Sequence, residues 1–61
     1  MTYAEKIKKL RSVMLVTQKE LASLLNVSAV TVNRWENGRF DPSIKEKRKL
    51  AIFFKENKIG E

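Results

Sequence analysis

One short pattern recurs along this chain of 61 residues and restricts what it can fold into. A hydroxyl residue is followed three positions later by glutamate at three places, namely Thr2 and Glu5, Thr17 and Glu20, and Ser43 and Glu46. In such a capping box the hydroxyl accepts a hydrogen bond from a backbone N–H in the first helical turn, and the carboxylate bonds back to the capping residue. Each pair precedes an apolar stretch with helical spacing, and Ser28 precedes a further one. The pattern therefore predicts an all-α chain with helices at roughly residues 2–13, 18–25, 29–37 and 44–56.

The composition removes several classes of function. The chain has no cysteine and no histidine, which excludes disulfides and thiolate metal sites and removes the commonest general base. We therefore expect no metal, no cofactor, no small-molecule ligand and no enzymatic activity. The longest apolar run, residues 50–54, is far shorter than the roughly 20 residues of a membrane-spanning helix. We expect a cytoplasmic protein without a membrane partner.

The charge points to a polyanionic partner. The chain has thirteen lysines and arginines and seven acidic residues, which gives a net charge of +6. An excess of this size in so short a chain is typical of proteins that bind nucleic acid or an anionic surface.

The second and third predicted helices form one compact unit. Their apolar residues can share a small core at the junction between the helices, formed by Leu21, Leu25, Val27, Val32 and Trp35. Only three residues separate the two helices, as a helix-turn-helix unit requires. We place this unit at about residues 18–37.

Helical periodicity also predicts what the third helix presents to solvent. If Val32 and Trp35 face the core, then four residues lie on the opposite side, with Ala29 and Thr31 on the flanks. These four are Val30, Asn33, Arg34 and Asn37. Arginine suits guanine, asparagine suits adenine and an apolar group suits the thymine methyl, so this face fits the base edges of DNA. The alternative interpretation is an ordinary solvated face with one stray valine, and the basic net charge favours the first.

The sequence resembles a known family in this region. The segments TQKELA at 17–22, VS at 27–28 and VNRWENG at 32–38 are similar to the phage-repressor and Cro type of helix-turn-helix domain, also called the xenobiotic-response-element type. The resemblance covers about residues 4–54. It implies a compact lambda-repressor-like fold of four helices, shortened from a five-helix pattern, with residues 1–61 forming a single DNA-binding domain.

The resemblance also implies roles for individual residues. Gln18 would cap the second helix and hold a DNA phosphate, with Thr17 close by, and Ser28 would begin the recognition helix and reach the DNA backbone. The base-reading positions would be Ala29, Val30, Thr31, Asn33 and Arg34. Asn37 and Arg39 would contact phosphate again. Arg11 and Glu36 match a buried ion pair that ties the first helix to the end of the third.

The chain departs from the family pattern at two helix ends. The family usually has glycine where this chain has Leu15 and Asn26. Asparagine tolerates the left-handed conformation, so Asn26 is a mild change. At Leu15 we expect either a different end to the first helix or backbone strain of roughly 1 kcal/mol.

The C-terminal segment also departs, because the chain is too short for a packed fifth helix. We expect Leu50, Ala51 and Phe54 to face the core together with Ile44, whereas Ile52 and Phe53 cannot share that face. Two interpretations of the remaining apolar residues stay open. Either the first helix covers them, or they form an exposed patch for docking or for a homodimer through Phe53, Phe54 and Ile59.

The leading hypothesis is sequence-specific binding of double-stranded DNA by a small, repressor-like transcriptional regulator, with the helix after Ser28 in the major groove. Two alternatives use the same fold. One is a protein-interaction module of the antitoxin or adaptor kind, and the other is the DNA-targeting domain of a larger DNA-modifying protein.

Overall fold

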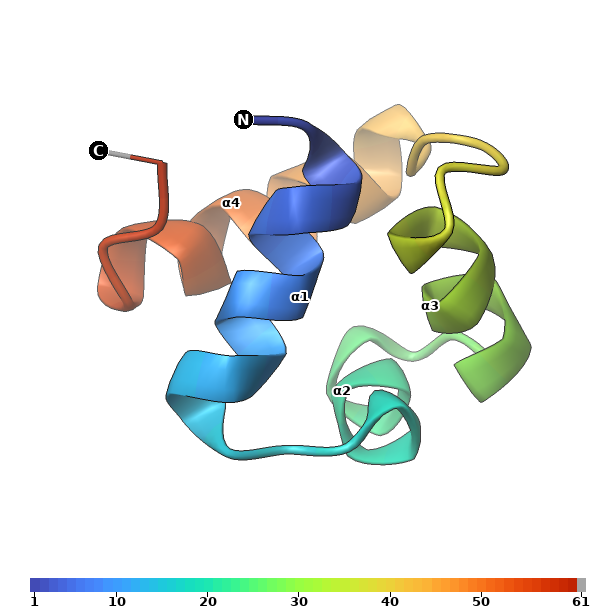
Figure 1. Ribbon diagram of the computed structural model, residues 1–61, viewed down its shortest axis with the longest axis horizontal. Coiled ribbons are helices and arrows are strands. Elements are labelled where there is room, and N and C mark those ends of the chain that lie inside the picture. The colour runs from blue at the N-terminus through green and yellow to red at the C-terminus, as the bar shows by residue number, and fades with distance from the viewer. Residues whose placement is uncertain (61) are drawn as a thin grey trace.

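The computed structural model describes residues 1–60, and within them it contains four α-helices and no β-strand. The helices are α1 (Tyr3–Met14), α2 (Gln18–Leu25), α3 (Ala29–Glu36) and α4 (Ile44–Glu56). In Figure 1, α1 runs through the middle of the molecule, α4 crosses behind it, and α2 and α3 lie together beside it. The predicted all-α, four-helix fold is confirmed. In residues 1–60, no helix combines the length and the apolar character needed to cross a membrane.

All four predicted capping residues begin a helix. The hydroxyls of Thr2, Thr17, Ser28 and Ser43 each accept a hydrogen bond from the backbone N–H three residues later, at 3.2, 3.1, 3.1 and 3.3 Å. In three of them a glutamate closes the capping box from the other side. The expected bounds hold within one residue, with the first helix shifted to Tyr3–Met14 and the third ending at Glu36.

Each helix is also stopped in the same way, by one residue in the left-handed conformation. These residues are Leu15, Asn26, Gly38 and Lys58, with φ of 58°, 58°, 71° and 56°. The next backbone N–H then bonds to a carbonyl five residues back, for example Val16 to Arg11 at 3.1 Å. This bond satisfies a carbonyl that the helix leaves free. Helix α1 therefore ends in the usual way, with Leu15 in the left-handed position where the family usually has glycine. Of the two outcomes expected at Leu15, a different helix end or backbone strain, the structure favours strain.

The core lies at the centre of the molecule and takes side chains from all four helices. Its buried apolar residues are Ile7, Leu10, Leu21, Ala22, Leu25, Val32, Trp35, Leu50, Phe54 and Ile59. Two core predictions are wrong: Ile44 is 70% exposed, and Ala51 is also exposed. On an α-helix both positions lie about 100–120° away from Leu50, so they point away from the side on which Leu50 is buried.

The segment after α4 completes this core, because Ile59 is buried in it. The turn at Lys58 brings Ile59 into the core, where it is 5% exposed, and Phe54 is 7% exposed. The Phe54 ring lies 6.3 Å from the ring of Tyr3, centroid to centroid. The predicted dimer contact is therefore wrong as far as Phe54 and Ile59 are concerned, because both side chains are already buried within the monomer. On this helix Phe53 is half-buried and Ile52 is 63% exposed.

Candidate nucleic-acid interface

Helix α3 presents its polar face to solvent. Val32 and Trp35 are 0% and 1% exposed, whereas Val30 on the opposite side is 57% exposed. Asn33, Arg34 and Asn37 are exposed on that side as well, and Ala29 and Thr31 are half-buried at its edges. The buried face packs on α1 and α2, so the backbone that carries the exposed residues is held rigidly.

The first turn of α3 differs in charge from those of the other helices. Glu5, Glu20 and Glu46 occupy the third position of α1, α2 and α4, but Thr31 occupies it in α3. The hydroxyl of Thr31 lies 2.9 Å from that of Ser28. The N-terminal end of a helix carries a partial positive charge that attracts anions. Only in α3 is this charge left without a carboxylate beside it.

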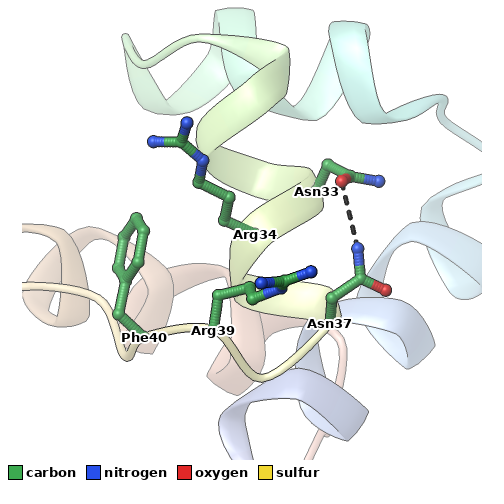
Figure 2. A pocket seen from close by; sticks show the side chains of 5 residues that line it. All are labelled: Asn33, Arg34, Asn37, Arg39 and Phe40. Atoms are coloured by element: carbon green, nitrogen blue, oxygen red, sulfur yellow. Dashed lines mark hydrogen bonds between the residues drawn. The ribbon is translucent and has the colours of Figure 1, made fainter.

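A shallow hollow of about 580 Å³ lies at the other end of α3. It is lined by Asn33, Arg34, Asn37, Arg39 and Phe40, and Figure 2 shows these side chains around the last turn of α3 and the loop after it. The left-handed Gly38 reverses the chain there, and the N–H of Arg39 donates to the carbonyl of Arg34 at 3.0 Å. Both guanidinium groups therefore lie on the same side of the molecule as the face of α3.

Four of the predicted DNA-binding residues line this hollow, and Phe40 is an addition that the sequence reasoning missed. Phe40 is 46% exposed and, in Figure 2, its ring stands beside Arg34. Its position directly after Arg39 was the available signal, because the loop that follows a recognition helix runs along the same surface. Ser28, Ala29, Val30 and Thr31 lie at the opposite end of α3, outside the hollow.

Two side chains in the hollow are joined directly. Asn33 and Asn37 are one helical turn apart, and Nδ2 of Asn37 donates a hydrogen bond to Oδ1 of Asn33 at 3.0 Å. Figure 2 shows this bond, with the amide nitrogen of Asn33 directed away from Asn37.

A buried carboxylate joins three helices behind the interface. Glu36, at the end of α3, accepts hydrogen bonds from Nε and Nη2 of Arg11 at 2.5 and 2.8 Å and from Nε2 of Gln18 at 3.0 Å. Burial raises the pKa of Glu36, but the bonds from Arg11 and Gln18 outweigh it and leave the pKa below its usual value. The hydrogen bond to Glu36 raises the pKa of Arg11. The structure thus places Arg11 and Glu36 in an ion pair and attaches α2 to it through Gln18.

The structure corrects the expected role of Gln18 as a helix cap. The cap of α2 is Thr17, whose hydroxyl and backbone N–H both bond to Glu20. Gln18 is the first helical residue, and its side chain is half-buried against Glu36.

The helix-turn-helix family model matches residues 7–58. Over 49 residues the chain is 43% identical to an uncharacterized HTH-type transcriptional regulator of Methanocaldococcus jannaschii, covering 80% of this chain and 74% of that protein. Over 54 residues it is 33% identical to the HTH-type transcriptional activator BcrR of Enterococcus faecalis, covering 88% of this chain and 26% of BcrR. No solved structure matches the chain.

The geometry and the comparisons agree. Two packed helices joined by a short turn, with the second exposing a polar and basic face, lie within the segment that the family model matches. The chain therefore belongs to the helix-turn-helix family of DNA-binding transcriptional regulators.

Proposed function

We propose that this chain binds specific sequences of double-stranded DNA and regulates transcription, with α3 in the major groove. The observation that carries the proposal is the face of α3, where Val30, Asn33 and Arg34 are exposed on a helix whose other side is buried. We propose that residues 1–61 act as one domain in which residues 18–37 form the helix-turn-helix unit. In this proposal the chain binds DNA without catalysing a reaction, and it acts in the cytoplasm.

The candidate DNA-binding residues divide into two groups, those that would contact bases and those that would contact the DNA backbone. Arg34 has the donor fork that suits O6 and N7 of guanine, and Val30 offers an apolar contact for the methyl group of thymine. Ala29 and Thr31 lie at the edges of the same face, where they would meet neighbouring bases.

A second group would hold the DNA backbone. Ser28 stands at the N-terminal end of α3, which lacks a carboxylate, and Arg39 lies in the loop after α3. Thr17 caps α2 and Gln18 begins it, and the N–H groups of the first helical turn that have no partner within the helix could bind phosphate. Asn37 lies beside Arg39 in the hollow. Phosphate contacts of this kind fix register and add affinity that falls with salt.

Two copies of the chain would pair through α4, which presents Ile52 and part of Phe53 to solvent. The recognition helices of such a homodimer should lie about 34 Å apart and read an inverted repeat. Sedimentation with and without DNA tests this pairing, and a monomer on a single half-site would reject it.

The experiment that tests the function is selection from a randomised pool of duplex DNA, followed by affinity measurements on the enriched site at several salt concentrations. Arg34→Ala should weaken specific binding by about 1–3 kcal/mol and relax the preference at one base pair. Arg48→Ala is the matched control, because it removes the same charge from the exposed side of α4. Equal effects of the two variants would reject α3 as the reading element. An absence of any enriched site would favour the protein-interaction alternative.

A further inference from the structure

We propose that Asn37 fixes the direction of hydrogen bonding at Asn33, so that Asn33 reads guanine and not adenine. The inference rests on the proposed function, because it requires α3 to lie in the major groove. Asn33 is the base-contacting residue in this proposal, and Asn37 is a positioning residue that acts through it.

The geometry gives Asn33 a defined polarity. Nδ2 of Asn37 donates to Oδ1 of Asn33 at 3.0 Å, and both side chains are otherwise exposed in the hollow. The carbonyl oxygen of Asn33 therefore faces Asn37, and its amide nitrogen faces outward (Figure 2). In the proposed complex, the two N–H donors of the Asn33 amide would therefore face the DNA.

The backbone holds Asn37 in place for this role. Asn37 is the C-cap residue directly after α3, and its own N–H donates to the carbonyl of Asn33 at 3.0 Å. The left-handed Gly38 follows, and its N–H bonds to Trp35, which is buried. The side chain of Asn37 thus extends from a fixed backbone one turn below Asn33.

The polarity decides which base fits. A free asparagine recognises adenine with both ends of its amide, since Oδ1 accepts from N6 and Nδ2 donates to N7. At Asn33, the bond from Asn37 occupies one of the two lone pairs of Oδ1 and turns Oδ1 toward Asn37, so Oδ1 is not free to turn toward the amino group of adenine while Nδ2 donates to N7. Guanine presents two acceptors, N7 and O6, and cytosine presents only a donor in the major groove. A side chain held with its N–H donors outward therefore favours guanine.

The test uses selection from randomised duplex DNA with four proteins: the parent, Asn33→Ala, Asn37→Asp and the double variant. The base pair whose preference disappears in Asn33→Ala is the one that Asn33 reads, and we expect guanine there in the parent. An aspartate at position 37 can only accept, so Asn33 must turn and present Oδ1 outward. The preference should then move to adenine or cytosine, the bases with an amino group, by roughly tenfold in relative enrichment.

Two controls separate this effect from a general disturbance of the fold. The base pair read by Arg34 should keep its preference in all four proteins, and the double variant should match Asn33→Ala. A merely structural role for Asn37 would lower affinity without moving any preference from one base to another.

Several results would overturn the inference. These are adenine at the Asn33 position in the parent, no position that depends on Asn33, or an unchanged preference in Asn37→Asp. Enrichment of a site by the parent would still uphold the proposed function in each of these cases. Failure of the parent to enrich any site would overturn both.

Discussion

Removing one partner of the Arg11–Glu36 pair should destabilise the protein unequally, depending on which partner is lost. The side chain of Glu36 is 4% exposed and that of Arg11 is 27% exposed. Arg11→Met leaves a carboxylate in the interior with only the bond from Gln18. Glu36→Gln leaves a guanidinium that already reaches water and an amide oxygen that still accepts a hydrogen bond. The first change is therefore the more costly one.

The magnitudes follow from these exposures. Arg11→Met should cost about 3–5 kcal/mol, because it strands a buried charge. Glu36→Gln should cost about 1–2 kcal/mol, the loss of one charge-assisted hydrogen bond from a site that stays polar. A domain of this length has roughly 3–9 kcal/mol of stability in total, so Arg11→Met removes most of it. Arg11→Lys keeps the charge but not the two-pronged geometry, and it provides a folded intermediate case.

The assay is urea unfolding followed by far-ultraviolet circular dichroism or by the fluorescence of Trp35, repeated from neutral to acid pH. In the parent the pKa of Glu36 is lowered. Its contribution is therefore complete above the unfolded pKa and is lost as the pH falls through the folded one. In Arg11→Met, burial is opposed only by the bond from Gln18 and the charge of Lys8, so the pKa of Glu36 should rise and acid should reduce the penalty. The stability gap between the two proteins should narrow on acidification. Glu5, whose pKa is lowered by its bonds to Thr2, is present in both and cancels.

Two results would refute this reasoning. One is a cost for Glu36→Gln that equals or exceeds the cost for Arg11→Met. The other is a gap between the parent and Arg11→Met that stays constant from neutral to acid pH, because a constant gap would mean that Glu36 does not depend on Arg11 for its charge.

Other expectations concern helix ends. Leu15 is left-handed and 88% exposed, so Leu15→Gly should relieve strain without loss of packing and raise stability by about 0.5–1 kcal/mol in urea unfolding. Asn26→Gly should gain less, since asparagine tolerates this conformation; an equal gain would contradict the strain argument. Lys49 donates from α4 to the carbonyl of Leu25 at 3.2 Å, at the end of a helix with no basic residue in its last turn. Lys49→Met should therefore lower stability by about 1 kcal/mol, whereas Lys45→Met on the exposed side should not.

Local signals allowed most of the fold to be predicted from the sequence. A capping box acts within four residues, so Thr2, Thr17 and Ser43 marked helix starts without knowledge of the tertiary structure. The position of α4 depends on its packing against α1, which no local pattern specifies. For this reason Ile44 was expected in the core and lies in solvent, and Ile59 was expected at an interface and lies in the core.

The candidate site shows the same limit at the level of side chains. Periodicity was enough to predict that Val30, Asn33 and Arg34 share an outward face. It could not predict which atoms bond to which, because that depends on rotamers and on neighbours brought together by folding. The bond between Asn37 and Asn33, on which the proposed guanine preference rests, is visible only in the structure.

The network at Glu36 connects stability to DNA binding. Glu36 accepts hydrogen bonds from Arg11 of α1 and from Gln18 of α2. The next residue in the chain is Asn37, which lines the hollow. The angle between α2 and α3 is therefore held by hydrogen bonds that are already formed before DNA arrives. A rigid interface loses less conformational entropy on binding than one that must be ordered. Arg11 has no place in the proposed DNA contacts, yet a folded Arg11→Lys protein should bind its site more weakly than the parent. The loss should appear equally at every base position, because the whole of α3 is affected and not one of its side chains.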